Sequence, residues 1–310
     1  MARQIKRVAV IGTGVIGASW ASLFLAKGLQ VTATDPAPGA EGALRNFISE
    51  AWPALEQIGL APGASQSNLT FNPDMKAAVA DADFVQENAP ERIDFKQKLY
   101  GELDEVLGPD VVLASSSSGL KVSDIQEGCK NYPERVVLGH PFNPPHIIPL
   151  VEIVGGTETS EETIERAIAF YAGLGKRPVR LHKEVPGHVA NRLAAALYRE
   201  VLYLVSAGVI SVADIDDAVS WGPGLRWGVM GPNMLYKLGG GAGGMKHFFE
   251  QFSAPMAGLW KVLGTPEITP ELAQSVIAGV DAEAGSHTAE ELSAQRDNVL
   301  LGLLALRKTA

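Results

Sequence analysis

The sequence predicts an α/β domain with a mostly parallel sheet, followed by an all-helical C-terminal domain. In the first half of the chain, short β-branched and aliphatic runs alternate with helical stretches, which is typical of parallel strands covered by helices on both faces. After the segment Val185-Pro186-Gly187 no strand-like run remains and helical periodicity takes over. A length of 310 residues also suits two domains. We therefore place the boundary between residues 185 and 186, giving domains 1–185 and 186–310.

The strands of the first domain are expected at short apolar runs. The run that begins at Arg7 (RVAVIG) is continuous rather than alternating, as expected for a strand buried on both faces. A helix is expected over residues 16–27 and ends at Gly28, and residues 30–35 form the second strand. The later strand candidates are residues 82–87, 110–115, 135–140, 150–154 and 177–181.

The helical domain is predicted from amphipathic periodicity and capping residues. Residues 191–207 carry a broad apolar stripe that ends at Gly208, a residue type that commonly terminates helices. Ser211, three residues before Asp214, is expected to cap the next helix. A last helix is expected over residues 288–307, and the glycine-dense piece 239–244 is expected to be a loop.

The charge and cysteine content disfavour several classes of partner. The chain has 26 Lys and Arg against 35 Asp and Glu, a formal net charge of −9, which disfavours binding to nucleic acid or to an anionic membrane. No apolar run approaches the roughly 20 residues that span a bilayer, and the first residues lack the apolar stretch of a signal peptide. The single cysteine, Cys129, fits a reducing compartment. We therefore expect a cytoplasmic protein with a small-molecule substrate.

A glycine-rich motif follows the first expected strand directly. Its residues are Gly12-Thr13-Gly14-Val15-Ile16-Gly17. The first glycine permits a tight turn, the second lets a pyrophosphate approach the backbone, and the third allows the helix to pack on the strand. The N-terminus of the following helix offers N–H groups and a partial positive charge to the phosphates. This context predicts a dinucleotide site of the Rossmann type.

Asp35 indicates which dinucleotide binds. It ends the second expected strand, 23 residues after Gly12, where its carboxylate can accept hydrogen bonds from an adenosine ribose. The carboxylate would repel the 2′-phosphate of NADP, and Pro36 and Ala37 supply no cation to offset that repulsion. We therefore expect NAD as the cofactor. The alternative is an ordinary glycine turn followed by an unrelated carboxylate at a strand end.

Three polar segments are predicted to meet at one edge of the sheet. Residues 115–118 are four serines after a strand, His140 ends another strand, and Glu152 interrupts an apolar strand. Because a carboxylate in an apolar strand is costly without a partner, we expect Glu152 to pair with His140 and to raise its basicity. The amide of Asn191, from beyond the domain boundary, is placed to reach the same cleft. Taken singly, these residues have structural alternatives: a satisfied buried histidine, a capping serine or asparagine, and a carboxylate facing water.

These segments together carry a family resemblance. The stretches 8–17, 115–120, 139–144 with 150–152, and 186–193 match, in order, the motifs of the 3-hydroxyacyl-CoA dehydrogenase superfamily. The resemblance covers nearly the full chain. It implies a homodimeric, NAD-dependent dehydrogenase that oxidises the hydroxyl of a 3-hydroxy acid. No metal is expected, because the six histidines show no ligand spacing.

The resemblance also implies roles for individual residues. His140 matches the general base, Glu152 its orienting partner, and Asn191 a group that binds the reacting oxygen. Ser118 matches the second oxygen-binding group, with Ser117 as the alternative within the serine run. Glu91 and Lys96 match positions on the nicotinamide side of the cofactor, and Ala89 and Ser116 are further expected cofactor contacts.

One segment separates this chain from the members that act on CoA thioesters. Where those carry a Tyr-Pro-Met-Gly-Pro-Phe type segment, residues 222–232 here read GPGLRWGVMGP. That segment resembles the branch acting on free 3-hydroxy acids, namely L-carnitine dehydrogenases and the L-gulonate 3-dehydrogenases akin to lambda-crystallin. Residues 240–248 and 295–300 look closer to the carnitine enzymes. The resemblance thus implies oxidation of L-carnitine to 3-dehydrocarnitine.

The charged groups of such a substrate need particular binding partners. Arg226 is the candidate for the carboxylate, since a guanidinium binds a carboxylate through two parallel hydrogen bonds. Aromatic faces bind quaternary ammonium ions, and the candidates are Phe142, Trp227, Tyr236 and Phe252. The alternative is that the aromatic residues are core and Arg226 is a surface cation. Other substrates left open are L-gulonate, 3-hydroxybutyrate and 3-hydroxyacyl-CoA, and a different class is a catalytically silent, NAD-binding structural protein.

Overall fold

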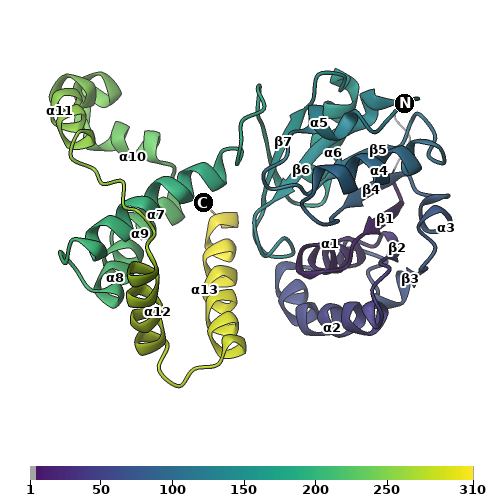
Figure 1. Ribbon diagram of the computed structural model, residues 1–310, viewed down its shortest axis with the longest axis horizontal. Coiled ribbons are helices and arrows are strands. Elements are labelled where there is room, and N and C mark those ends of the chain that lie inside the picture. Colours follow the sequence, from purple (N-terminus) through teal and green to yellow (C-terminus); the bar gives the residue numbers. More distant parts are fainter. Residues whose placement is uncertain (1–4, 310) are drawn as a thin grey trace. The chain divides into compact units, whose positions relative to one another are not determined.

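The chain divides into two compact units between Arg192 and Leu193 (Figure 1). The computed structural model describes residues 5–309. Within these residues the first unit contains a sheet covered by helices, and the second unit contains helices only. The predicted fold class, a mostly parallel α/β domain followed by an all-helical domain, is therefore confirmed.

The sheet of the first unit has the strand order β3-β2-β1-β4-β5-β6-β7-β8. Neighbouring strands are parallel except β6 and β7, which are antiparallel. The order reverses between β1 and β4, and open α/β sheets bind ligands at such a switch point, beyond the carboxyl ends of the strands. The strands are β1 (Arg7–Ile11), β2 (Gln30–Thr34), β3 (Leu69–Phe71), β4 (Phe84–Glu87), β5 (Val112–Ser115), β6 (Val136–Pro141), β7 (Leu150–Gly155) and β8 (Arg177–Arg180).

Two hydrophobic cores cover the two faces of this sheet. Val8 and Val10 of β1 belong to one core, and the intervening Ala9 and Ile11 belong to the other. The first core includes α1 (Val15–Ala26), α2 (Ala40–Ile58) and α6 (Glu161–Gly173), and Figure 1 shows α1 and α2 side by side. The second includes α3 (Met75–Val79), α4 (Ile93–Asp104) and α5 (Val122–Gln126). Burial on both faces explains why the strand sequences are continuous apolar runs.

The second unit is built from helices that follow α7 (Ala190–Ser206), whose first turn still belongs to the first unit. As predicted, Ser211 caps the next helix, because its hydroxyl accepts a hydrogen bond from the N–H of Asp214 (3.1 Å). None of the helices formed by residues 5–309 is long and apolar enough to cross a membrane. The helices after α7 are α8 (Val212–Trp221), α9 (Pro223–Val229), α10 (Pro232–Gly239), α11 (Gly244–Trp260), α12 (Pro270–Ala284) and α13 (Ala289–Thr309).

Two local features differ from the sequence prediction. The edge strand β3 was not predicted, because only three residues, Leu-Thr-Phe, form it and their apolar signal is short. The expected glycine loop over residues 239–244 is shorter than predicted. Gly239 ends α10, Gly244 begins α11, and a short 3-10 turn (Gly241–Gly243) lies between them.

Candidate active site

The glycine-rich turn connects β1 to α1 at the switch point of the sheet. Gly12 has φ +80°, and a Cβ atom there would lie 2.7 Å from the carbonyl oxygen of Asn88. A Cβ atom at Gly17 would lie 1.8 Å from the carbonyl oxygen of Gly12. Packing therefore requires these two glycines. A Cβ atom at Gly14 would meet no protein atom within 4 Å, so its small size serves something other than packing.

The start of α1 suits a pyrophosphate. Gly14 is the N-cap residue, no side chain caps the helix, and its first turn contains no acidic residue. The N–H groups of Val15 and Ile16 are in the first turn, where a helix attracts anions. The turn therefore fits the phosphates of a dinucleotide.

Asp35 follows β2 directly and holds the same turn. Its Oδ2 accepts hydrogen bonds from the N–H (2.7 Å) and the hydroxyl (3.2 Å) of Thr13, and its Oδ1 accepts from the N–H of Ala37 (2.9 Å). The carboxylate therefore stabilises the glycine-rich turn through Thr13. It lies directly after β2, where the ribose contact was predicted. Its contact with a ribose remains a prediction.

A cavity of about 430 Å³ opens beside this turn and is lined by residues of the first unit. Asn143 and Pro141 contribute to it, as does Asn88. It gathers many of the residues predicted for the site, from five different parts of the chain. These are Ile16, Ala89, Glu91, Lys96, Ser116, Ser118, His140, Phe142 and Asn191.

His140 and Glu152 face each other across the antiparallel strands β6 and β7. They are register partners, and His140 Nδ1 lies 2.9 Å from Glu152 Oε2. Both side chains are buried. The pairing expected from the sequence is therefore present at the cavity.

The second oxygen of Glu152 holds the segment that enters α7. Oε1 accepts hydrogen bonds from the N–H groups of Val189 (2.8 Å) and Ala190 (2.9 Å). Burial alone would raise the pKa of Glu152, but the hydrogen bonds from His140 and from these two N–H groups hold that pKa below its ordinary value. One carboxylate therefore positions both the imidazole and the first turn that carries Asn191.

The serine run after β5 places its members in different environments. Ser117 is buried, and its hydroxyl donates to Glu91 Oε1 (2.6 Å) and accepts from the N–H of Leu120 (3.0 Å). Ser118 is exposed and lines the cavity. The geometry therefore favours Ser118 over Ser117 as the serine that faces a substrate.

Glu91 and Asn191 border the same loop. Glu91 Oε1 accepts hydrogen bonds from the N–H groups of Gly119 (2.7 Å) and Leu120 (3.2 Å). Burial would raise the pKa of Glu91, but hydrogen bonds, the first from Ser117, hold that pKa below its ordinary value. Asn191 lies in the first turn of α7, with Nδ2 3.5 Å from the carbonyl oxygen of Ser118.

Asn88 connects the glycine-rich turn to residues 116–120, the loop after β5 that we call the serine loop. Its Nδ2 donates to the carbonyl oxygen of Ile11 (3.2 Å), and its Oδ1 accepts from the hydroxyl of Ser116 (2.7 Å). Ser116 also accepts hydrogen bonds from Trp20 Nε1 (3.2 Å) and Gln86 Nε2 (2.9 Å). The carboxyl ends of β1, β4 and β5 are therefore tied together here. Sequence reasoning did not identify Asn88.

Lys96 is engaged in a buried ion pair that the sequence analysis missed. Its Nζ lies 2.5 Å from Glu87 Oε1 and 3.2 Å from the carbonyl oxygen of Ala89, and its side chain is 1% exposed. Glu87 also accepts from the N–H of Ala89 (2.5 Å) and the hydroxyls of Tyr100 (3.0 Å) and Ser115 (2.8 Å). The available signal was the polar triplet Gln86-Glu87-Asn88 that closes an apolar strand.

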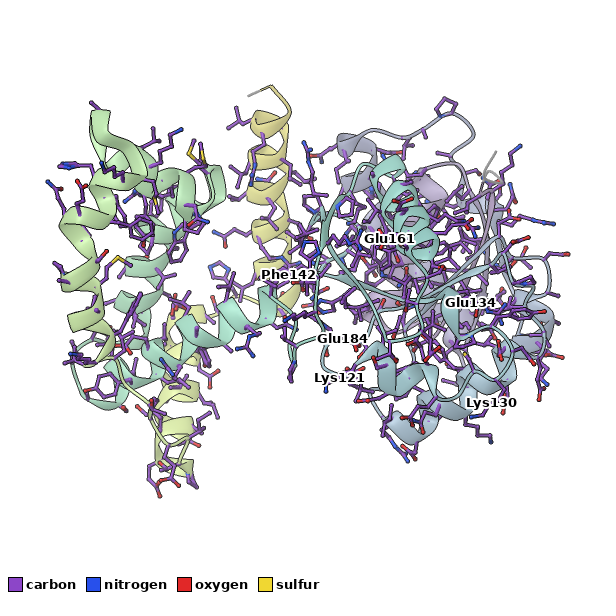
Figure 2. The ribbon with its side chains drawn as sticks, turned by 90° about the horizontal axis from the view of Figure 1, so that it is seen from above. Lys121, Lys130, Glu134, Phe142, Glu161 and Glu184 are labelled. Carbon is purple, nitrogen blue, oxygen red and sulfur yellow. The ribbon has the colours of Figure 1, made fainter. Side chains whose placement is uncertain are left out.

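Phe142 is the predicted aromatic contact that lies in the first unit. It follows β6, is 37% exposed and lines the cavity. Figure 2 labels it together with Glu134, which precedes β6, and the two residues lie at opposite ends of that strand. The cavity therefore has an aromatic side chain available on the loop that follows His140.

The other predicted substrate contacts belong to the second unit. Phe248 is buried there, with ring centroids 4.6 Å from Tyr236 and 5.1 Å from Phe252, so these three rings form one stacked cluster. Arg226 and Trp227 are exposed on α9. The structure thus brings Tyr236 and Phe252 together through Phe248. Among residues 5–309 there is no group of three or more acidic, histidine or cysteine residues arranged to hold a metal ion.

The family is established by two matches that cover most of the chain. The NAD-binding domain of 3-hydroxyacyl-CoA dehydrogenase matches residues 7–185, and the C-terminal domain of 3-hydroxyacyl-CoA dehydrogenase matches residues 187–273. The chain belongs to this family. It is an NAD-dependent dehydrogenase of 3-hydroxy acids, so the predicted family, enzyme class and cofactor are confirmed.

Individual relatives extend the similarity over nearly the whole chain. The chain is 48% identical to an L-carnitine dehydrogenase of Pseudomonas putida, over 99% of this chain and 95% of the relative. It is also 48% identical to an L-carnitine dehydrogenase of Streptomyces griseus, over 97% of this chain and 90% of the relative. A solved structure of 5-formyl-3-hydroxy-2-methylpyridine 4-carboxylic acid 5-dehydrogenase, an NAD+-dependent dismutase, is similar with a TM-score of 0.86 and 34% identity, covering 98% of this chain and 99% of that one.

Proposed function

We propose that this enzyme oxidises L-carnitine to 3-dehydrocarnitine with His140 as the general base. The observation that carries the reaction is the buried His140–Glu152 pair, which lies at one cavity with Ser118 and Asn191. The choice of L-carnitine is supported by relatives of that name at 48% identity, whose similarity spans both units.

The Glu152 contact determines which nitrogen of His140 acts. A carboxylate only accepts hydrogen bonds, so His140 Nδ1, at 2.9 Å from Glu152, carries the proton of the neutral imidazole. Nε2 then has the free lone pair and takes the proton of the substrate hydroxyl. Glu152 stabilises the imidazolium that forms.

The oxygen of the substrate needs partners while its bond to carbon becomes a double bond. The hydroxyl of Ser118 and the amide of Asn191 line the cavity and are the groups we assign to that oxygen. The glycine-rich turn would hold NAD+, which would supply the hydride acceptor for the carbon that bears the hydroxyl. The proton therefore goes to His140 Nε2 while the hydroxyl becomes a carbonyl.

The charged ends of L-carnitine are assigned to the cation and the aromatic residues predicted from the sequence. Phe142, exposed at the cavity, offers an aromatic face to the quaternary ammonium. In the second unit, Arg226 is assigned to the carboxylate, and Trp227, Tyr236 and Phe252 are further aromatic candidates. Replacement of Arg226 by Met is expected to raise KM for the acid more than it lowers kcat.

The decisive experiment follows NADH formation with a panel of substrates. The panel is L-carnitine, D-carnitine, L-gulonate, 3-hydroxybutyrate and 3-hydroxybutyryl-CoA, each with NAD+. Selective turnover of L-carnitine supports the proposal. Turnover of another member instead would retain the reaction and refute the substrate, and absence of turnover with every member would refute both.

We also propose that the enzyme is a homodimer. In the described part of the second unit only Leu202, Ile215, Phe248 and Leu272 are buried hydrophobic residues. Many large apolar side chains there are exposed, among them Trp221 (75%), Leu225 (57%) and Trp260 (64%). Apolar surface on this scale is typical of association sites. Sedimentation that detects only monomer would refute the dimer.

A further inference from the structure

We propose that His188 is a positioning residue: an uncharged imidazole that fixes the main chain of the serine loop next to the catalytic base. This inference rests on the proposed roles of His140 and Ser118. His188 lies in the segment that leads into α7 and is 3% exposed. It does not line the cavity, so its effect on the reaction is exerted through its neighbours.

The hydrogen bond of His188 determines its tautomer. Nε2 lies 3.0 Å from the carbonyl oxygen of Ser117. A carbonyl oxygen only accepts hydrogen bonds, so Nε2 must carry a proton. His188 therefore donates to the backbone of the residue that precedes Ser118.

The other ring nitrogen shows why this imidazole stays neutral. Nδ1 is buried and has no hydrogen-bond partner within the described residues. A second proton would have to sit on that nitrogen, without an acceptor, in a ring whose centroid is 5.0 Å from that of His140. Burial lowers the pKa of His188, and repulsion from His140 adds to this, against the opposite effects of the Ser117 hydrogen bond and of Glu152 and Glu91. His140, Glu152 and Glu91 are the titratable groups that act on this imidazole.

The neutral state matters because His140 takes up a proton during the reaction. A second positive charge 5.0 Å away would make His140 a weaker base. Because the imidazoles of His140 and His188 are adjacent, a charge on one disfavours a charge on the other. The proton taken from the substrate therefore stays on His140, which is paired with Glu152. His188 therefore supplies a hydrogen bond at this place without competing for the proton.

The unusual backbone conformation of His188 is a second indication that its side chain is needed at this position. Its φ is +51°, and within residues 5–309 it is the one residue other than glycine with a positive φ. Residues other than glycine are uncommon in the left-handed region. Unfavourable backbone conformations of this kind persist mainly where the surrounding contacts require them, and they cluster at functional sites.

The serine loop is the element that His188 holds in place. Ser118 follows Ser117 directly and lines the cavity, and its carbonyl oxygen lies 3.5 Å from Asn191 Nδ2. A shift of the Ser117 carbonyl would therefore displace the groups assigned to the reacting oxygen. Misplacement of a reacting group by about 1 Å can lower a rate by on the order of 100-fold.

Three substitutions separate the hydrogen bond from the imidazole ring. In His188→Gln the amide NH2 reaches the place of Nε2 and still donates, and it cannot become charged. In His188→Phe a ring remains but no donor is present. In His188→Asn the left-handed backbone is well tolerated, but the side chain is too short to reach Ser117. The asparagine variant keeps the test valid if the phenylalanine variant fails to fold.

Activity is measured with the panel substrate that the wild-type enzyme turns over fastest. We expect His188→Gln to keep kcat within about threefold, and His188→Asn and His188→Phe to lose at least about tenfold in kcat, with unchanged affinity for NAD. Equal kcat in the glutamine and asparagine variants, whether near wild type or strongly reduced, would overturn the proposal.

A second measurement needs no substrate. Amide hydrogen exchange of the peptide that contains residues 117–120 is expected to accelerate in His188→Asn and to stay near wild type in His188→Gln. Equal exchange in both would overturn the positioning role. His140→Ala serves as the reference for the proposed function: if that variant keeps turnover, the general-base assignment fails. If it is inactive while His188→Asn behaves like wild type, only the present inference fails.

Discussion

Two buried carboxylates at the same edge of the sheet, Glu87 and Glu152, organise their surroundings differently. Glu87 is fully buried and accepts hydrogen bonds from four donors, one of which is the ammonium of Lys96. Glu152 divides its two oxygens between the imidazole of His140 and two backbone N–H groups. The first arrangement ties strand ends together. The second connects a titratable ring to the segment that enters α7.

The comparison teaches that burial and position alone do not determine what a buried carboxylate can do. Both side chains are at most 2% exposed, and both lie at the edge where the sheet binds its ligands. The difference is the partner, because imidazole is the side chain whose unperturbed pKa allows its charge to change between pH 5 and 8. The Glu152 arrangement therefore suits the proton transfer that we propose for His140.

The largest effect is expected for His140→Ala. Loss of the proposed general base should lower kcat by about 10³-fold. Binding of NAD should be unchanged, because the glycine-rich turn and Asp35 are untouched. Steady-state kinetics and a binding titration with NAD measure the two quantities. A kcat within tenfold of the wild type would remove the basis of the comparison.

Glu87→Gln tests the other half of the comparison through stability. The substitution removes the nearer of the two carboxylates that pair with the buried ammonium of Lys96 and leaves Glu91, at 4.0 Å. Breaking a buried ion pair typically costs about 3–5 kcal/mol. Urea unfolding measures this loss. The matched control is Glu87→Gln with Lys96→Met, which removes both charges and should recover much of the stability. If the single variant is as stable as wild type, the pair does not stabilise this edge.

Glu152→Gln should separate the role of the oxygen that contacts His140 from the role of the oxygen that holds the segment before α7. The amide oxygen can still accept from the N–H groups of Val189 and Ala190, but the amide NH2 must donate to His140 Nδ1. This forces the remaining ring proton onto Nε2, and we expect kcat to fall by about 10²-fold with little change in stability. Glu152→Ala, which loses both contacts, should also unfold at a lower urea concentration. Wild-type kcat in the glutamine variant would mean that the tautomer of His140 is set by something else.

The smallest effect concerns the pH dependence of stability near His188. Because its pKa is lowered in the folded chain, the unfolded chain binds more protons once the pH falls below the ordinary value of about 6.5. The free energy of unfolding therefore decreases as the pH falls through this window. His188→Gln removes this contribution, so its stability should vary less between pH 6.5 and 5.5. Urea unfolding at several pH values measures it, and identical slopes would contradict the lowered pKa.

The pair at the centre of the site was predictable because two sequence signals agreed. A carboxylate inside the apolar strand around Glu152 required a partner, and His140 ended the strand before it in the chain. The antiparallel register of β6 and β7 then places the two residues opposite each other. The fold class was predictable for a similar reason, because strand and helix periodicities differ along most of the first unit.

The remaining contacts depend on the path of the backbone, which residue types do not determine. Ser117 and Ser118 are identical in type, and only the turn after β5 buries one and exposes the other. The contacts of Glu152 Oε1 come from residues 37 and 38 positions further along the chain. In the sequence alone, Glu87 and Asn88 do not differ from an ordinary strand end. Their importance arises from the neighbouring strand ends, which only the assembled sheet brings together.

The steric requirement at Gly12 has a consequence for protein engineering. The atom that excludes a side chain at Gly12 is the carbonyl oxygen of Asn88, and the amide of the same asparagine holds Ile11 and Ser116. The nucleotide-binding turn is therefore shaped from outside its own sequence. A designer who transplanted residues 12–17 into another parallel sheet would transfer the glycines without the surface they fit. The smallest portable unit includes the first residues after β4, and chimeras of related dehydrogenases should exchange the two segments together.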